Sequence, residues 1–244
     1  MRDQSWFTVI VELVLIVAGV FLGMQVSNWN EARNERQQEV VILGRLAADF
    51  RDIESSLLEN LSKTARNIEV LHQLSQQVGQ IGGSEDITTD MRLLIEATNT
   101  VSIIGGSPTY EELLSNGNFG LLQSALLRNA LGAYAQTNKF TDFVHRTIWD
   151  ATLQFSPQIL KINTVAFASM NAPDGGRLFK RKLDELFQYD DLVVEIGSFI
   201  ATQKYMYLRD NENLTAARAV LKELGQEPNG RTQTQLIDDI FGAN

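Results

Sequence analysis

The sequence predicts an all-α protein in which an N-terminal transmembrane helix continues into a helical bundle domain. Residues 7–29 form a long apolar stretch with a single charged residue, Glu12. Beyond this stretch, apolar residues recur about every 3.6 positions, which is the period of an amphipathic helix. Only four prolines occur in 244 residues, and no strand-like alternation of useful length is present. We therefore expect a short tail at 1–6, the transmembrane helix at 7–29 and a single bundle domain at 30–244.

The apolar stretch has the length and the borders of a membrane span. At about 1.5 Å per residue, twenty helical residues cover about 30 Å, the thickness of the hydrocarbon core of a bilayer. Trp6 and Trp29 flank the stretch, as interfacial anchors do. The alternative is a cleaved secretory signal, whose apolar core of about 7–15 residues ends in small residues at the cleavage site. Residues 25–29, QVSNW, lack that pattern, which favours a retained anchor.

One face of the predicted span carries small residues and the only charge. Small residues let a second helix approach closely, and an ionisable group costs about 2–3 kcal/mol in the membrane unless it is paired, neutralised or in reach of the headgroups. The face fits contact with another transmembrane helix. The alternative is that the glycines reflect ordinary membrane-helix composition and that the acidic side chain reaches the headgroups. At about 100° per residue, the residues within about 80° of one another are Glu12, Ile16, Gly19, Gly23 and Ser27.

The charged residues beside the span leave its orientation nearly balanced. Arg2 precedes it, whereas Arg33 and Arg36 follow it, interleaved with Glu31 and Glu35. The positive-inside rule mildly favours a cytoplasmic C-terminal flank. An N-terminal anchor with a very short tail, however, commonly behaves as an uncleaved export signal. For that reason we favour a periplasmic bundle domain.

A stripe of apolar residues after the span predicts one long helix. No glycine or proline interrupts residues 24–43, so we expect the span to continue as a helix until Gly79 and Gly82-Gly83 stop it. We interpret the stripe as the core face of a bundle rather than a free coiled coil, because a strict 3.5-residue repeat with flanking charge pairs is not sustained. The stripe consists of Leu46, Phe50, Ile53, Leu57, Leu61, Ala65, Ile68, Leu71, Leu74 and Val78.

Start and stop signals divide the rest of the chain into shorter helices. Ser107 is a suitable N-cap with Pro108 in the first helical position, and Asn116-Gly117-Asn118 ends that helix. Pro157 is expected to kink a long helix. The expected helices are 84–98, 107–116, 121–135, 139–170, 177–187, 190–224 and 233–241, with a loop at 171–176.

Composition and spacing argue against several functional classes. The net charge is −9, whereas nucleic-acid binding needs a basic face. The absence of cysteine excludes a disulfide framework, a thiolate zinc site and a cysteine nucleophile. His72 follows Glu69, and His145 follows Asp142, at a spacing that allows local pairing, but no HxxxH or HExxH motif occurs. We expect no cofactor, no bound metal and no enzymatic activity.

Two further concentrations of side chains have simple structural interpretations. The basic one is expected to be a solvated helix face, with an acidic partner or lipid headgroups as the alternative; it consists of Arg177, Lys180, Arg181 and Lys182. The aromatic one is expected to be core, although bundles also build ligand grooves between helices. Its members are Phe140, Phe143, Trp149, Phe155 and Phe167.

Two blocks of the sequence carry a resemblance. The opening VELVLIVAGVFLGMQVSNWNEARNER resembles an uncharacterised family of bacterial single-pass inner-membrane proteins, whose span has an early Glu and ends in an Asn-Trp-Asn-Glu-like junction. The resemblance implies a helical protein anchored in the cell inner membrane and carries over no catalytic or binding residue. The second similar block is formed by Thr109–Leu113, Asn116-Gly117, Gly120–Leu122, Leu127-Arg128 and Tyr134.

We derive two hypotheses for the function. The first is a non-enzymatic accessory or interaction subunit of a membrane complex or homo-oligomer. Its partners would be the lipid bilayer and other transmembrane helices, and not nucleic acid. The alternative is a membrane-tethered helical sensor or ligand-binding domain.

Overall fold

The computed structural model describes residues 3–79, 91–99, 104–155, 157–186, 189–230 and Gln235, and within these ranges the chain is helical without a β-strand. This confirms the all-α fold class. The α-helices are α1 (Asp3–Gly79), α2 (Met91–Asn99), α3 (Pro108–Ser115), α4 (Ala125–Phe155), α5 (Pro157–Ser169), α6 (Gly175–Leu186) and α7 (Tyr189–Glu223), and a 3₁₀ turn, η1 (Asn118–Leu121), follows α3.

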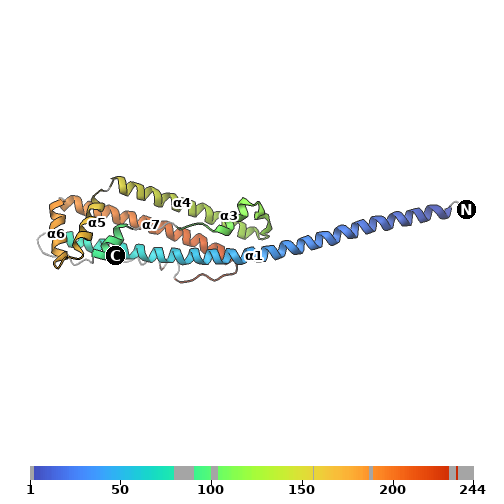
Figure 1. The fold of residues 1–244 in the computed structure, drawn as a ribbon, viewed down its shortest axis with the longest axis horizontal. Helices are drawn as coiled ribbons and strands as arrows, with labels where there is room; N and C mark the ends of the chain where they lie inside the picture. Colours follow the sequence, from blue (N-terminus) through green and yellow to red (C-terminus); the bar gives the residue numbers. More distant parts are fainter. Residues whose placement is uncertain are drawn as a thin grey trace.

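Helix α1 is one continuous rod that begins outside the bundle and ends inside it (Figure 1). Its 77 residues extend over about 115 Å at about 1.5 Å per residue. The N-terminal part projects away from the other helices, and its most apolar window has a mean hydropathy of 2.5 with no part buried. Within the described residues, the chain therefore has one helix, near its N-terminus, that is long and apolar enough to cross a membrane.

The bundle is built from the C-terminal half of α1 together with α4 and α7. Helix α4 runs in the same direction as α1, and α7 returns antiparallel in contact with both (Figure 1). Helix α3 and η1 lie at the end nearer the projecting part of α1, whereas α2, α5 and α6 lie at the remote end. A long helix thus passes from the apolar projection directly into the bundle, where α7 lies between it and α4 (Figure 1).

Two apolar clusters fill the bundle, and the predicted stripe contributes to both. Its residues from Leu46 to Leu74 are buried, except for the half-buried Ala65, because α7 packs along α1 and α2 and α3 add contacts. This burial favours a bundle core over a free coiled coil, and the side chain of Val78 lies outside the described residues. The near cluster contains Leu46, Phe50, Ile53, Leu57, Leu61, Leu113, Leu122, Leu127, Leu131, Tyr134, Tyr207, Leu214, Ala217, Val220 and Leu221. The remote cluster contains Ile68, Val70, Leu71, Leu74, Leu94, Ala97, Ile162, Val165, Ala166, Phe179, Leu183, Ile196, Phe199 and Ile200.

Helix α4 differs from the prediction because it has no break at residues 136–138. Asn138 stays helical and faces α7, where its Oδ1 accepts a hydrogen bond of 2.8 Å from Nδ2 of Asn213. Such tertiary contacts outweigh the weak helix propensity of asparagine. The predicted boundary between a helix at 121–135 and a helix at 139–170 is therefore wrong, because α4 continues through it.

At Pro157, where the sequence predicts a kink, the described helix α5 begins, and Ser156 between it and α4 lies outside the described residues. Proline cannot donate a backbone hydrogen bond inside a helix but fits the first helical position. Helix α4 ends at Phe155 and α5 begins at Pro157. Of the predicted helix at 84–98, the structure describes the part from Met91 onward, which belongs to α2. The predicted helix at 233–241 lies outside the described residues except for Gln235.

Three of the five aromatic residues that were expected in the core are exposed. Phe140, Phe143 and Phe167 are 48%, 63% and 63% exposed. The inner face of α4 at this level carries the buried Thr141 and His145, and Phe140 and Phe143 point away from it. The side chains of Trp149 and Phe155 lie outside the described residues.

Candidate functional site

The structure leaves the small-residue face of α1 uncovered. Glu12, Ile16 and Ser27 are exposed, and a Cβ built on Gly19 or Gly23 would meet no atom within 4 Å. The predicted interface anchors Trp6 and Trp29 are likewise 73% and 67% exposed. No described part of the bundle reaches this face. Lipid or another helix must therefore cover it if α1 spans a membrane.

Between the near and remote clusters, the bundle contains a layer of polar side chains, all buried except the half-buried Asn138, which we call the polar layer. Buried polar groups normally need hydrogen-bond partners to offset the loss of water. A polar layer therefore restricts how the three helices can slide past one another. Its members are Asn60, Thr64 and Asn67 of α1, Asn138, Thr141 and His145 of α4, and Gln203, Asp210, Asn211 and Asn213 of α7.

His145 and Asp210 are the titratable pair of the polar layer. They are 2% and 3% exposed, and Nε2 of the histidine lies 3.2 Å from Oδ1 of the carboxylate. Burial raises the pKa of Asp210, and the contact with His145 lowers it in part. Asp142, which the spacing allowed as a local partner of His145, accepts hydrogen bonds of 3.0 and 3.1 Å from Nε of Arg146.

Glu54 is a second buried charge, and it joins α1 to the segment after α7. The side chain is fully buried, and its Oε1 accepts hydrogen bonds of 2.9 Å from Nε of Arg218 and from the backbone N–H of Asn229. Arg51 lies 3.1 Å from the other oxygen. Two guanidinium groups thus neutralise the carboxylate, and the arrangement holds the chain after α7 against α1.

The start of α3 is fixed to α1 through Asp49. Ser107 caps α3 as predicted, since its Oγ accepts a hydrogen bond of 3.1 Å from the backbone N–H of Tyr110. The same hydroxyl donates to Oδ2 of Asp49 at 2.7 Å, and the Thr109 N–H donates to that oxygen at 2.9 Å. An ion pair between Arg45 and Glu112 adds a contact one turn away. These contacts hold the segment that precedes α3 in a defined place.

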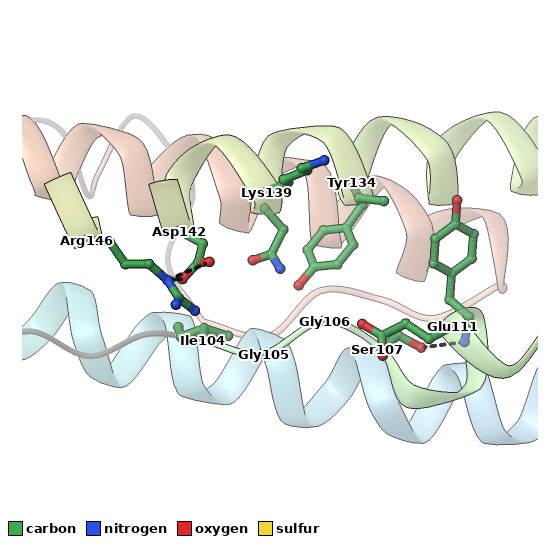
Figure 2. Close-up of a pocket in the computed structure, with 12 residues that line it drawn as sticks. Ile104, Gly105, Gly106, Ser107, Glu111, Tyr134, Lys139, Asp142 and Arg146 are labelled. Atoms are coloured by element: carbon green, nitrogen blue, oxygen red, sulfur yellow. Dashed lines mark hydrogen bonds and ion pairs between the residues drawn. The ribbon is translucent and has the colours of Figure 1, made fainter. Parts of the chain in front are cut away.

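A pocket of about 410 Å³ lies between that segment and α4 (Figure 2). Because Asn138 belongs both to the lining and to the polar layer, the pocket connects the surface with the polar interior. The lining residues are Ile104, Gly105, Gly106, Ser107, Tyr110, Glu111, Tyr134, Ala135, Asn138, Lys139, Asp142 and Arg146.

The Tyr134 hydroxyl is the most unusual group of the pocket. Tyr134 is 1% exposed, its ring packs edge-on against Phe50 at 4.8 Å between centroids, and its hydroxyl points toward Gly106 (Figure 2). Among the residues that the structure describes, the hydroxyl has no hydrogen-bond partner. Burial also raises the pKa of Tyr134 well above its usual value, so the hydroxyl stays protonated. It is therefore a neutral donor and acceptor facing the pocket.

Charged side chains of both signs surround the pocket. Glu111 and Lys139 are exposed, and neither forms an ion pair with a described residue, whereas Asp142 and Arg146 pair with each other. Figure 2 shows Asp142 and Arg146 at the Ile104 end and Glu111 at the other. The pocket therefore offers one carboxylate, that of Glu111, which no intramolecular ion pair neutralises, whereas the Lys139 side chain extends from α4 away from Gly106 (Figure 2).

The other side chains that the sequence offered as candidates, the histidine His72 and the basic residues of α6, do not form a binding site with other described residues. Glu69 accepts a hydrogen bond from Gln73 at 2.9 Å, and His72 is half-buried. Among the described residues, no group of three or more His, Cys, Asp or Glu side chains converges. The basic residues of α6 lie at the remote end of the bundle, where Lys180 pairs with Asp184 and Lys182 with Glu185. This position, far from the apolar projection, favours a solvated face over contact with the same membrane.

A comparison with known families places the chain. The model of a family of unknown function, DUF6090, matches residues 12–172. The chain belongs to this family. The DUF6090 match begins at Glu12 within the apolar helix and includes the residues that line the pocket. No curated protein and no solved structure matches the chain.

Sequence reasoning did not find the pocket, the Glu54 contacts or the His145–Asp210 pair. Each joins residues from segments far apart in the chain, so helical periodicity gives no signal for them. The one local hint was Gly105-Gly106 directly before a capped helix start, which marks a backbone segment that side chains do not obstruct.

Proposed function

We propose that this protein is a non-enzymatic single-pass protein of the bacterial inner membrane that acts as an accessory or interaction subunit. In this proposal its transmembrane helix contacts another such helix, in a hetero-complex or a homo-oligomer, and the bundle lies in the periplasm. The observation that carries the proposal is the uncovered face with Gly19, Gly23 and Glu12. The lack of cysteine and of ligand-spaced histidines supports a non-enzymatic role.

Inside a bilayer, the hydrophobic effect does not drive helices together, because the surrounding lipid is itself apolar. Helices there associate through close packing and polar contacts, and residues without large side chains permit both. Glu12 on the same face would gain from a polar or basic partner, because an isolated charge in the membrane is costly. Since α1 continues unbroken to Gly79, a partner that holds the span also fixes the position of the bundle.

The proposal is tested by purifying the full chain in a mild detergent. We expect stoichiometric co-purification of a second membrane protein, or a mass that corresponds to two or more copies of this chain. A monomer without any associated membrane protein, both in mild detergent and after cross-linking in intact membranes, would contradict the proposal.

The second candidate function is a membrane-tethered sensor or ligand-binding domain. The pocket beside Tyr134 supports it, because small-molecule sites are concave and contain a few oriented polar groups. A signal from the pocket would have to pass to a partner through α1 or the bundle surface. The two candidate functions are compatible, since they use different parts of the molecule, the projecting part of α1 and the bundle.

A further inference from the structure

We propose that the pocket between residues 104–111 and α4 binds a small zwitterion of the amino-acid type, with one ammonium and one carboxylate group. The proposal deepens the ligand-binding function suggested above and rests on it. It does not depend on whether the transmembrane helix has a partner. Three observations carry it: the buried hydroxyl of Tyr134, the space that Gly106 leaves open, and the Glu111 carboxylate beside that space.

The Tyr134 hydroxyl supplies the polar end of the pocket. A buried hydroxyl without a partner is unfavourable, and a ligand oxygen placed beside it would remove that penalty. The hydroxyl is protonated and points into the space above Gly106 (Figure 2). A hydrogen bond from a neutral donor to a carboxylate is stronger than one to a neutral oxygen. The hydroxyl therefore suits the carboxylate of a ligand.

Gly106 keeps the bottom of the pocket open. A Cβ at this position would lie 3.1 Å from Oε1 of Glu111 and 3.8 Å from Nδ2 of Asn138, whereas a Cβ on Gly105 would meet nothing within 4 Å. The glycine thus leaves room between a carboxylate and an amide donor. A ligand in that space can offer its ammonium group to Glu111 and its carboxylate to the Asn138 amide.

The charge pattern selects a zwitterion over an ion of one sign. Glu111 attracts the ammonium group and repels a second carboxylate of a diacid, while the Tyr134 hydroxyl and the Asn138 amide can donate to the ligand carboxylate. A polyamine has no acceptor for these donors. The Asp142–Arg146 pair neutralises itself and adds no net charge. The pocket volume of about 410 Å³ lies in the range of small-molecule sites.

The experiment measures binding to the full chain in mild detergent by isothermal titration calorimetry. The probes are the free amino acids. Succinate, a diacid, spermidine, a polyamine, and glucose, which is uncharged, serve as controls. We expect at least one free amino acid to bind and to raise the melting temperature. Tyr134→Phe should weaken its affinity by at least about tenfold, the effect of one hydrogen bond to a charged group, while leaving the unliganded protein as stable as wild type. Tyr205→Phe makes the same change on α7, outside the pocket, and should have no effect on affinity.

A second pair of variants separates the pocket from general effects on folding. Gly106→Ala should weaken the same affinity several-fold, because its Cβ displaces the Glu111 carboxylate, whereas Gly105→Ala should bind as wild type. Amino-acid binding that neither Tyr134→Phe nor Gly106→Ala changes would overturn the assignment to this pocket. Tyr134-dependent binding of succinate, spermidine or glucose alone would overturn the zwitterion but retain a ligand-binding function. Binding of none of the probes would overturn both.

Discussion

His145 of α4 and Asp210 of α7 face each other inside the bundle, with 3.2 Å between Nε2 and Oδ1. Both side chains are buried, and the pair lies in the polar layer between the two apolar clusters. Replacing such a pair by apolar residues is often neutral for stability, whereas removing one partner is costly. The pair therefore contributes more to fixing the register of α4 against α7 than to the net stability of the fold.

The pair predicts how stability depends on pH. Burial raises the pKa of Asp210 in the folded protein above its usual value of 3.8. The folded protein then binds the carboxyl proton of Asp210 more tightly than the unfolded chain does. The stability gained from this is fully present below the pKa of Asp210 in the unfolded chain, and it is lost as pH rises through the pKa in the folded protein. We expect the free energy of unfolding of the wild type to fall relative to Asp210→Asn over that range. Denaturant titrations at a series of pH values measure this, and a constant difference would contradict the pKa shift.

Glu54 predicts a large effect of a small chemical change. Glu54→Gln keeps the shape but leaves Arg218 and Arg51 beside a neutral group in a buried site. Removing one partner of a buried ion pair typically costs about 3–5 kcal/mol. Glu59→Gln is the matched control, because Glu59 pairs with Lys63 on the solvent-exposed side of α1. Denaturant unfolding should show a clear loss for Glu54→Gln and almost none for Glu59→Gln, and equal losses would disprove the role of the buried charge.

The apolar stripe of α1 predicts core energetics. Leu57 and Ile68 are 0% and 4% exposed and belong to different clusters. Replacing either by alanine should lower the free energy of unfolding by about 2–5 kcal/mol. Val40→Ala, at a position 69% exposed on the same helix, should change it by less than about 0.5 kcal/mol. Near-zero effects at both core positions would mean that α1 stands free as a stalk.

The sequence was sufficient where structure follows from local patterns. The period of the stripe predicted that Leu57 and Ile68 face a core, and the Ser107-Pro108 pair predicted the start of α3. Both signals depend on residues within a few positions of one another. The long uninterrupted helix followed equally from the lack of glycine and proline between residues 24 and 43.

Sequence reasoning failed where side chains from distant helices decide the outcome. His145 turns to Asp210 because it lies on the inner face of α4, whereas Asp142 turns outward to Arg146. Phe140 was expected in the core, yet it lies outside under the guanidinium of Arg209, at 5.9 Å from the ring centre. Which face of a helix is buried depends on the helices that pack against it, and the positions of those helices cannot be predicted from residues close together in the sequence.

The small-residue face of α1 predicts a measurable association. If Gly19 and Gly23 contact another helix, replacing either by leucine forces the backbones apart and weakens association by about 1–2 kcal/mol. Val14→Leu and Phe21→Leu on the opposite face should have little effect, because lipid tolerates apolar exchange. Glu12→Gln keeps the shape and the hydrogen-bonding capacity without the charge, so it separates an ion pair from a simple polar contact. Cross-linking in membranes and co-purification in mild detergent measure all of these variants. If both glycine variants associate as the wild type does, the span is only an anchor, and any interaction must involve the bundle.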